Sequence, residues 1–343
     1  MRDVADADIP FSLLGAQLAP VQDLLDDDAV SEIAVNRPGE VWIERAGAAV
    51  MERRDQPEFS IDRLKVLANA VAAASRQEIS PARPLLSARL STGERIQLVF
   101  EPVIERGVAL AIRRQVMQHV TLQQYASGGF FDNVVLADDT ALSETDRSLG
   151  ALLREGNIEA FMTRAVTERK NIIVSGGTSS GKTTFANALI GAIPGGERLI
   201  GIEDAREMAP HHANFLPLIA SRGGQNAAGE TVTAKHLLEA SLRLRPDRIL
   251  LGELRGEEAY PYLRAINSGH PGSITTVHSD TPGGALDQIG FMVLQSGIGL
   301  EFEAVKAYVR SIIDVIVQLR RIDGQRRIES IWFRPLETMA ATG

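Results

Sequence analysis

A lysine and two threonines end a glycine-rich stretch near the middle of the chain. Residues 176–184 read GGTSSGKTT, which fits the spacing of a phosphate-binding loop. In such a loop, backbone N–H groups surround the phosphates of a nucleotide, and the next helix adds the positive end of its dipole. Lys182 is expected to reach the β- and γ-phosphates, and the Thr183 hydroxyl to bind Mg²⁺. The predicted ATP-binding residues of the loop are Gly176, Gly177, Thr178, Ser179, Ser180, Gly181, Lys182, Thr183 and Thr184.

The segments on either side of this loop favour the same interpretation. Residues 171–174 contain the β-branched run that is typical of a buried parallel strand. Residues 184–193 carry apolar side chains at helical spacing. The alternative is a glycine-rich turn with a solvated lysine, because the bare pattern also occurs by chance. The strand and the helix stand where the motif requires them, so we expect nucleotide binding.

Acidic residues follow two further predicted strands. Strands are expected over residues 198–202, 248–251 and 273–277, alternating with helical segments as in a doubly wound nucleotide-binding fold. Glu203 and Asp204 follow the first of these strands, and Glu253 follows the second. Chemistry in such folds collects at the carboxyl ends of the strands, so we expect these acids to lie near the loop.

Transfer of a phosphoryl group to water requires a metal, a positioned water and positive charge opposite the γ-phosphate. Glu253 is expected to orient or polarise the attacking water. Glu203 either does the same or holds the Mg²⁺ shell, and the sequence does not separate these roles. For both glutamates the structural alternative is an ion pair with an arginine such as Arg255.

Two histidines, His270 and His278, lie on either side of the strand at 273–277. Zinc binding is one interpretation, but two histidines without a third clustered ligand make a poor zinc site. A buried histidine with a structural role is more plausible than zinc, particularly for His270, which follows Gly269.

The composition restricts the domain number and the partners. With 343 residues the chain exceeds the size of a single growing core, so two domains are expected. The net charge of -8 provides no overall positive field for nucleic acid. The chain has no cysteine, which excludes disulfides and cysteine-based zinc sites. No apolar run approaches the roughly 20 residues that span a bilayer, and the N-terminus is acidic, so a cytoplasmic protein is expected.

The first part of the chain predicts a smaller α+β domain without a catalytic motif of its own. Its pattern predicts a helix over 11–25, a hairpin within 30–51, a helix over 61–74 and strands within 85–112. We expect an N-terminal domain over 1–116, a linker over 117–150 and a nucleotide-binding domain over 151–343. A capping sequence at 143–146 should start the helix at the end of this linker.

Four motifs in order resemble those of the secretion and type IV pilus ATPases. Besides the phosphate-binding loop, or Walker A motif, these are IEDARE at 202–207, LGELR at 251–255 and GHPGSITTVH at 269–278. They resemble the Asp box, Walker B motif and His box of that superfamily. GERIQ at 93–97 and AIRR at 111–114 resemble the arginine-bearing strands of its N-terminal domain. The seven residues between His270 and His278 and the lack of cysteines favour the hexameric traffic ATPases of type IV secretion.

This resemblance implies a RecA-like P-loop ATPase domain behind the smaller α+β domain. It further implies Mg²⁺-dependent ATP hydrolysis in a homohexameric ring at the cytoplasmic face of the inner membrane, which powers substrate export or pilus assembly together with other secretion components. Arg95 and Arg113 would bind the phosphates when the N-terminal domain closes, for which a guanidinium fork is well suited. His270 and His278 would sense the γ-phosphate or contact a neighbouring subunit.

The chain departs from the superfamily pattern in three places. No aspartate directly follows the Walker B strand, so Mg²⁺ contact through water is expected there. Gly256 stands where many members have aspartate, and Gly201 where threonine is common. Two other functions remain open: a RecA-like nucleic-acid motor, which would need a basic or aromatic groove, and a scaffold that binds ATP without hydrolysing it.

Overall fold

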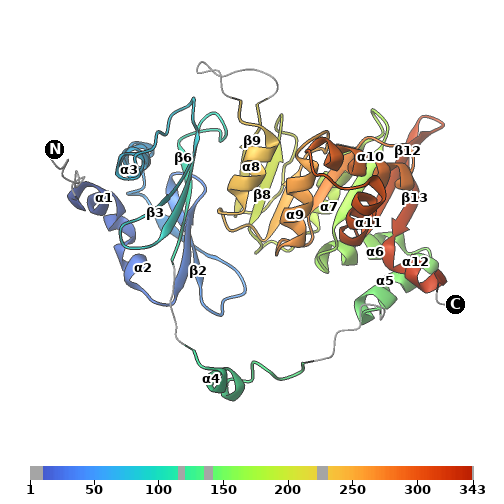
Figure 1. The fold of residues 1–343 in the computed structure, drawn as a ribbon, viewed down its shortest axis with the longest axis horizontal. Coiled ribbons are helices and arrows are strands. Elements are labelled where there is room, and N and C mark those ends of the chain that lie inside the picture. Colours follow the sequence, from blue (N-terminus) through green and yellow to red (C-terminus); the bar gives the residue numbers. More distant parts are fainter. Residues whose placement is uncertain (1–10, 115–119, 135–141, 222–230, 342–343) are drawn as a thin grey trace.

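The computed structural model describes residues 11–114, 120–134, 142–221 and 231–341. Two β-sheets dominate it, and they stand side by side with helices around them (Figure 1). The acidic N-terminal residues 1–8 and the acidic pair at 138–139 of the expected linker lie outside the described residues. No helix among the described residues is both long and apolar enough to cross a bilayer.

The first sheet has six antiparallel strands in the order β3-β2-β1-β6-β5-β4. The helix α3 packs on it, with Ser60 as the N-cap that accepts a hydrogen bond from the backbone N–H of Arg63. The N-terminal helical stretch is divided into α1, a 3-10 turn η1 and α2, and Pro20 lies at the start of that turn. The bounds are α1 Phe11–Leu18, η1 Ala19–Val21, α2 Gln22–Asp26, β1 Val30–Val35, β2 Gly39–Arg45, β3 Glu52–Gln56, α3 Ile61–Ala74, β4 Leu85–Arg89, β5 Arg95–Phe100 and β6 Val108–Arg113.

The second sheet has seven strands in the order β13-β12-β7-β11-β10-β8-β9, and only β13 runs antiparallel to its neighbour. The strand β7, which precedes the glycine-rich loop, lies inside this sheet between β12 and β11. The strand bounds are β7 Ile172–Gly176, β8 Leu199–Glu203, β9 Phe215–Ile219, β10 Arg248–Leu251, β11 Ile274–Val277, β12 Val315–Ile322 and β13 Gln325–Phe333.

Helices cover both faces of the second sheet (Figure 1). The helix α7 begins directly after the loop and packs its apolar side chains against β7, β12 and the helix α6. The bounds are α4 Leu122–Ser127, α5 Glu144–Arg154, α6 Ile158–Thr167, α7 Lys182–Gly191, α8 Ala234–Ser241, α9 Ala259–Asn267, α10 Pro282–Gln295, α11 Phe302–Ile312 and α12 Arg334–Ala341.

The two sheets share a buried contact at β8 and β9. Trp42 of β2 and Val103, which lies between β5 and β6, belong to the same core cluster as the inner strands of the second sheet. The backbone N–H of Ile219 donates to the carbonyl of Val103 at 2.7 Å. Asn36 donates to Asn214 at 2.9 Å in the buried part of this contact. The first sheet therefore packs against the β8–β9 side of the second sheet in this chain.

The expected α/β fold class is confirmed, and the helix at 61–74 has the predicted bounds. The parallel strands at 198–202, 248–251 and 273–277 are also found within a residue of prediction. The sequence did not reveal β9, β12 or β13. The expected boundary at residue 150 falls inside α5, whose Leu149 is buried against α6, so the division into 1–116, 117–150 and 151–343 stays a proposal.

Candidate active site

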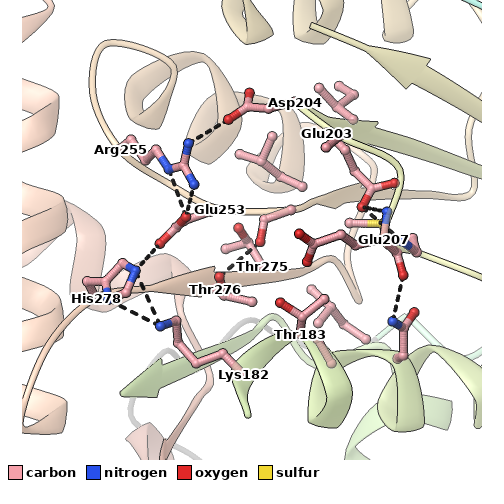
Figure 2. A pocket seen from close by; sticks show the side chains of 18 of the residues that line it. Lys182, Thr183, Glu203, Asp204, Glu207, Glu253, Arg255, Thr275, Thr276 and His278 are labelled. Atoms are coloured by element: carbon pink, nitrogen blue, oxygen red, sulfur yellow. Dashed lines mark hydrogen bonds and ion pairs between the residues drawn. The ribbon is translucent and has the colours of Figure 1, made fainter. Parts of the chain in front are cut away.

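A cavity of about 480 Å³ opens at the carboxyl ends of β7, β8, β10 and β11. The glycine-rich loop forms one wall, and the residues that follow β8 and β10 form the opposite wall (Figure 2). The predicted site residues that line it are Thr178, Ser179, Ser180, Gly181, Lys182, Thr183, Thr184, Glu203, Glu253 and His278. Thus the structure brings most of the predicted site residues together in one cavity.

Glycine is required at two positions of the loop. Gly181 has φ +94°, a left-handed conformation that other residues rarely adopt. At Gly176 a Cβ atom would stand 2.5 Å from Ser180 Oγ and 2.8 Å from the carbonyl oxygen of Leu319. Because glycine has no side chain, the loop can turn tightly over the end of β7 at these two positions. The helix α7 then starts at the edge of the cavity.

Lys182 is held by the loop itself. Its Nζ donates to the carbonyl oxygens of Gly176 and Gly177 at 2.9 and 3.1 Å, and lies 3.2 Å from His278 Nδ1. Burial lowers the pKa of the Lys182 ammonium, while the nearby carboxylate of Glu253 acts in the opposite direction. The lysine is thus a half-desolvated donor, and a bound phosphate would offer it better acceptors than two carbonyl groups.

Glu253 lies between His278 and Arg255. Its Oε1 is 2.8 Å from His278 Nε2, and its Oε2 accepts from Arg255 Nε at 2.7 Å. Arg255 also donates to Asp204 Oδ2 at 2.6 Å, so it connects the acids that follow β8 and β10 (Figure 2). The ion pair with Arg255 that the sequence left as an alternative is present. It holds the carboxylate at the cavity wall, 15% exposed, facing the loop across His278 and Lys182.

Glu203 has one satisfied and one unsatisfied carboxylate oxygen. Oε1 accepts from the backbone N–H groups of Glu207 and Met208 at 3.0 and 2.9 Å. Oε2 is buried without a hydrogen-bond partner among the described residues. Burial raises the pKa of this carboxyl, and the two N–H donors only partly oppose that effect. A buried carboxylate oxygen without a partner beside the cavity is a suitable ligand for a cation.

The donor set fits Mg²⁺. The Thr183 hydroxyl lines the cavity on the loop side, and the free oxygen of Glu203 lies on the opposite wall. Mg²⁺ prefers oxygen ligands and usually keeps several waters and substrate phosphates in its shell, so few protein ligands suffice. Among the described residues, no group of three or more His, Asp or Glu side chains is placed so that it could hold a metal ion by itself.

Five predicted site residues do not line this cavity: Gly176, Gly177, Arg95, Arg113 and His270. The two glycines nevertheless contact it indirectly, since their carbonyls accept from Lys182. Arg95 and Arg113 are paired across β5 and β6, and Arg113 also stands opposite Glu32 of β1. Glu32 lies beside Arg198 and Arg245, which precede β8 and β10. Arg113 is therefore near the amino ends of these strands, opposite to the cavity. Its binding of phosphates stays a prediction.

His270 also lies at the amino end of its strand. Its Nδ1 is 2.9 Å from the carbonyl oxygen of Pro246, and its own carbonyl accepts from the Ser273 hydroxyl. Burial lowers the pKa of this imidazole. Within the single chain His270 therefore stabilises the turn before β11. Its proposed contact with the phosphates stays a prediction.

Arg326 of β13 lines the cavity, although sequence reasoning did not select it. Its place depends on the hairpin β12–β13, and motif spacing carries no information on that pairing. Thr275 was missed for a simpler reason: it lies within the predicted strand at 273–277, where its side chain was not considered. Its hydroxyl is buried, lines the cavity and has no partner among the described residues.

The structure also explains one departure from the superfamily pattern. A Cβ atom at Gly201 would stand 2.8 and 2.9 Å from two ring carbons of Phe215 on the neighbouring strand β9. The ring of Phe215 occupies the space that a threonine side chain would need. At Gly256 the nearest atom to a Cβ is 3.6 Å away, so the position has room for a side chain.

Comparisons with known proteins agree with this geometry. Residues 15–326 match the family described as Type II/IV secretion system protein. The chain is 38% identical over 334 residues to the Type IV secretion system protein VirB11 of Bartonella quintana, which covers 94% of this chain and 93% of that protein. It is 39% identical over 325 residues to VirB11 of Brucella suis, with 93% and 89% covered. The crystal structure of the VirB11 ATPase from the Brucella suis type IV secretion system, in complex with sulphate, superimposes with a TM-score of 0.88 at 38% identity over 95% of this chain and 99% of that one.

Proposed function

The chain belongs to the Type II/IV secretion system protein family, and from this premise we propose that it hydrolyses Mg²⁺-ATP as the ring-shaped motor of a type IV secretion system. It is a secretion ATPase with a nucleotide-binding loop. The observation that carries the catalytic assignment is the continuous line of contacts from Lys182 through His278 to Glu253. This line spans the cavity from the phosphate-binding loop to the acid at the end of β10.

Lys182 and Glu253 have complementary tasks in the proposed reaction. Lys182 would exchange the carbonyls of Gly176 and Gly177 for oxygens of the β- and γ-phosphates, where its charge stabilises the transition state. Glu253 would orient the attacking water and accept its proton. His278 contacts both side chains, so a movement of Lys182 toward the γ-phosphate would change the contact between His278 and Glu253.

Thr183 and Glu203 would hold Mg²⁺, directly or through water. Held there, the metal would supply positive charge to the phosphates of the nucleotide. Glu203 has a second possible task, because its raised pKa would also suit a group that accepts a proton. The hydrogen bonds from Glu207 and Met208 fix one oxygen and leave the other available, which is the arrangement of a ligand more than of a mobile base.

We infer six subunits, attachment to the cytoplasmic face of the inner membrane and work with other secretion components. The relatives named above are components of type IV secretion systems, which supports this part of the proposal. The net charge of -8 disfavours direct binding of nucleic acid, so the exported substrate would be a protein or nucleoprotein that other components present.

The test is ATP turnover by the purified chain, compared with Lys182→Ala. The variant should lose hydrolysis at saturating ATP and keep its thermal unfolding temperature within a few degrees, since the hydrogen bonds of Lys182 within the described part of the chain go to the loop carbonyls and His278. Wild-type turnover in this variant would overturn the site assignment. A wild-type chain that binds ATP but does not hydrolyse it would instead identify a scaffold.

A further inference from the structure

The hairpin β12–β13 extends past the end of β7 where the phosphate-binding loop begins. β12 pairs in parallel with β7, and Leu319 stands opposite Gly176 in that register. A few residues later the chain reverses at Asp323 and Gly324, with φ of 50° and 79°. Positive φ at both residues is typical of a two-residue hairpin turn with Asp-Gly. The tip of the hairpin therefore lies beyond the first glycine of the loop.

The register of the hairpin decides which of its arginines face the loop. Directly paired residues share one face of a sheet, and so do residues two apart along a strand. Leu319 pairs with Ile328, and both pack in the apolar cluster around α7. Arg321 pairs with Arg326 two residues further toward the tip. Arg326 therefore lies on the same face of the hairpin as Leu319 and Ile328, which pack near α7. It stands closer to the tip, beyond the N-terminus of that helix.

Contacts agree with this placement. Arg326 lines the cavity, and its Cδ lies 2.8 Å from the point where a Cβ on Gly181 would stand. Two arginines line the cavity in the described part of the chain, and Arg255 is bound to Glu253 and Asp204. The guanidinium of Arg326 has no hydrogen-bond or ion-pair partner among the described residues. It is the arginine that remains available for a ligand.

The strand order tells which end of the nucleotide Arg326 would meet. β10 and β8, which carry the acids, lie on one side of β7, and the hairpin β12–β13 lies on the other. Glu253 and His278 define the γ-phosphate end of the proposed site. The opposite end of the phosphate chain must then point toward the hairpin. We propose that Arg326 binds the α-phosphate of the nucleotide, a contact that rests on the proposed function of this cavity.

The chemistry of this contact predicts its kinetic signature. A guanidinium donates two parallel hydrogen bonds to phosphate oxygens. The α-phosphate is present in ATP and ADP and takes no part in the bond that breaks. The contact therefore stabilises substrate, transition state and product alike, and its loss raises KM without lowering kcat.

The experiment compares Arg326→Ala with Arg327→Ala in the assembled protein. Arg327 is the neighbouring exposed residue and pairs with Arg320 on the other face of the hairpin. For Arg326→Ala we expect about a tenfold rise in the Kd of ADP, measured by calorimetry, and in the KM for ATP. The value of kcat should stay within about twofold, and Arg327→Ala should match the wild type. Arg326→Lys keeps the positive charge but cannot donate two parallel hydrogen bonds, so its Kd and KM should lie between those of the wild type and Arg326→Ala.

Three outcomes overturn the assignment. An unchanged Kd and KM in Arg326→Ala would remove Arg326 from the nucleotide site. A loss in kcat with unchanged KM would place it at the reacting phosphate. A lysine variant as weak as the alanine variant, with an altered ratio of GDP to ADP affinity, would indicate a contact with the base. Lys182→Ala separates these outcomes from failure of the proposed function, because it must abolish turnover if the cavity is the ATPase site at all.

Discussion

His278 Nε2 lies 2.8 Å from Glu253 Oε1, and Lys182 Nζ lies 3.2 Å from Nδ1 and 3.4 Å from Nε2 of the same imidazole. The histidine therefore connects the loop that binds the phosphates with the acid proposed to orient the water. Because Arg255 holds the other oxygen of Glu253, the carboxylate is restrained from two sides. If Glu253 is the general base, as proposed, this restraint would position it before the nucleotide arrives.

Glu253→Gln should slow ATP turnover at least ~100-fold and leave nucleotide affinity within a few-fold, because the amide keeps the shape but cannot accept the proton. The measurement is steady-state phosphate release together with the Kd of a slowly hydrolysed ATP analogue. Glu257→Gln, at an exposed residue that contacts Lys235, is the matched control. If affinity falls while the rate at saturation is kept, Glu253 is a metal ligand instead.

Gly201→Ala should lower the free energy of unfolding by about 1–3 kcal/mol, since the added methyl group meets the ring of Phe215 at 2.8 Å. Gly256→Ala, where the nearest atom is 3.6 Å away, should change it by about 0.5 kcal/mol or less. Urea denaturation of both variants checks this. Adding Phe215→Leu to Gly201→Ala should recover part of the loss, and purely additive effects would show that the clash is not the cause.

Sequence reasoning located those parts of the site in which consecutive residues determine position. The loop after β7 and the acids after β8 and β10 are fixed by strand ends, which alternating patterns reveal. Arg326 depends on a strand pairing, and the contact of Asn36 with Asn214 joins residues 178 positions apart. Neither the strand pairing nor this long-range contact produces a recognisable pattern in the local sequence. β9 was missed because Pro217 interrupts the apolar run that would mark a strand.

Glu32 provides a pH-dependent test of the contact between the sheets. Burial raises its pKa to about 7, although Arg113, Arg198 and Arg245 act against this and Glu44 acts with it. A carboxyl with a raised folded-state pKa favours the folded protein in its protonated form. Its destabilising effect is therefore absent below its unfolded value of 4.5 and grows as the pH rises to about 7.

Glu32→Gln should accordingly raise the melting temperature at pH 8 by several degrees and leave it nearly unchanged at pH 4.5. Differential scanning calorimetry across this range is the measurement, with the exposed Glu52→Gln as control. An equal effect at both pH values would mean that folding does not raise the pKa of Glu32. A loss of stability at pH 8 would show that its pairing with the arginines outweighs its desolvation.

Arg113 lies beside Glu32, near the amino ends of β8 and β10, while Lys182 lies at the carboxyl ends of the same sheet. In this arrangement the two cannot serve one nucleotide within one chain. If Arg95 and Arg113 bind phosphates, they do so in a neighbouring subunit or after the first sheet has moved. The roughly 30 residues that connect Arg113 with α5 could reach about 100 Å when extended, so either placement is within reach.

Mixed rings distinguish these arrangements. One subunit carries Lys182→Ala, and the other carries Arg95→Ala with Arg113→Ala; each alone should be inactive. If the arginines act on a neighbour's nucleotide, an arginine-deficient subunit beside a lysine-deficient one forms a site with an intact lysine and intact arginines. Part of the ATPase activity should then return on mixing, with a maximum near equal proportions. If closure takes place within each subunit, every site lacks one partner at all mixing ratios. A flat activity across the titration would therefore exclude the exchange of arginines between neighbours.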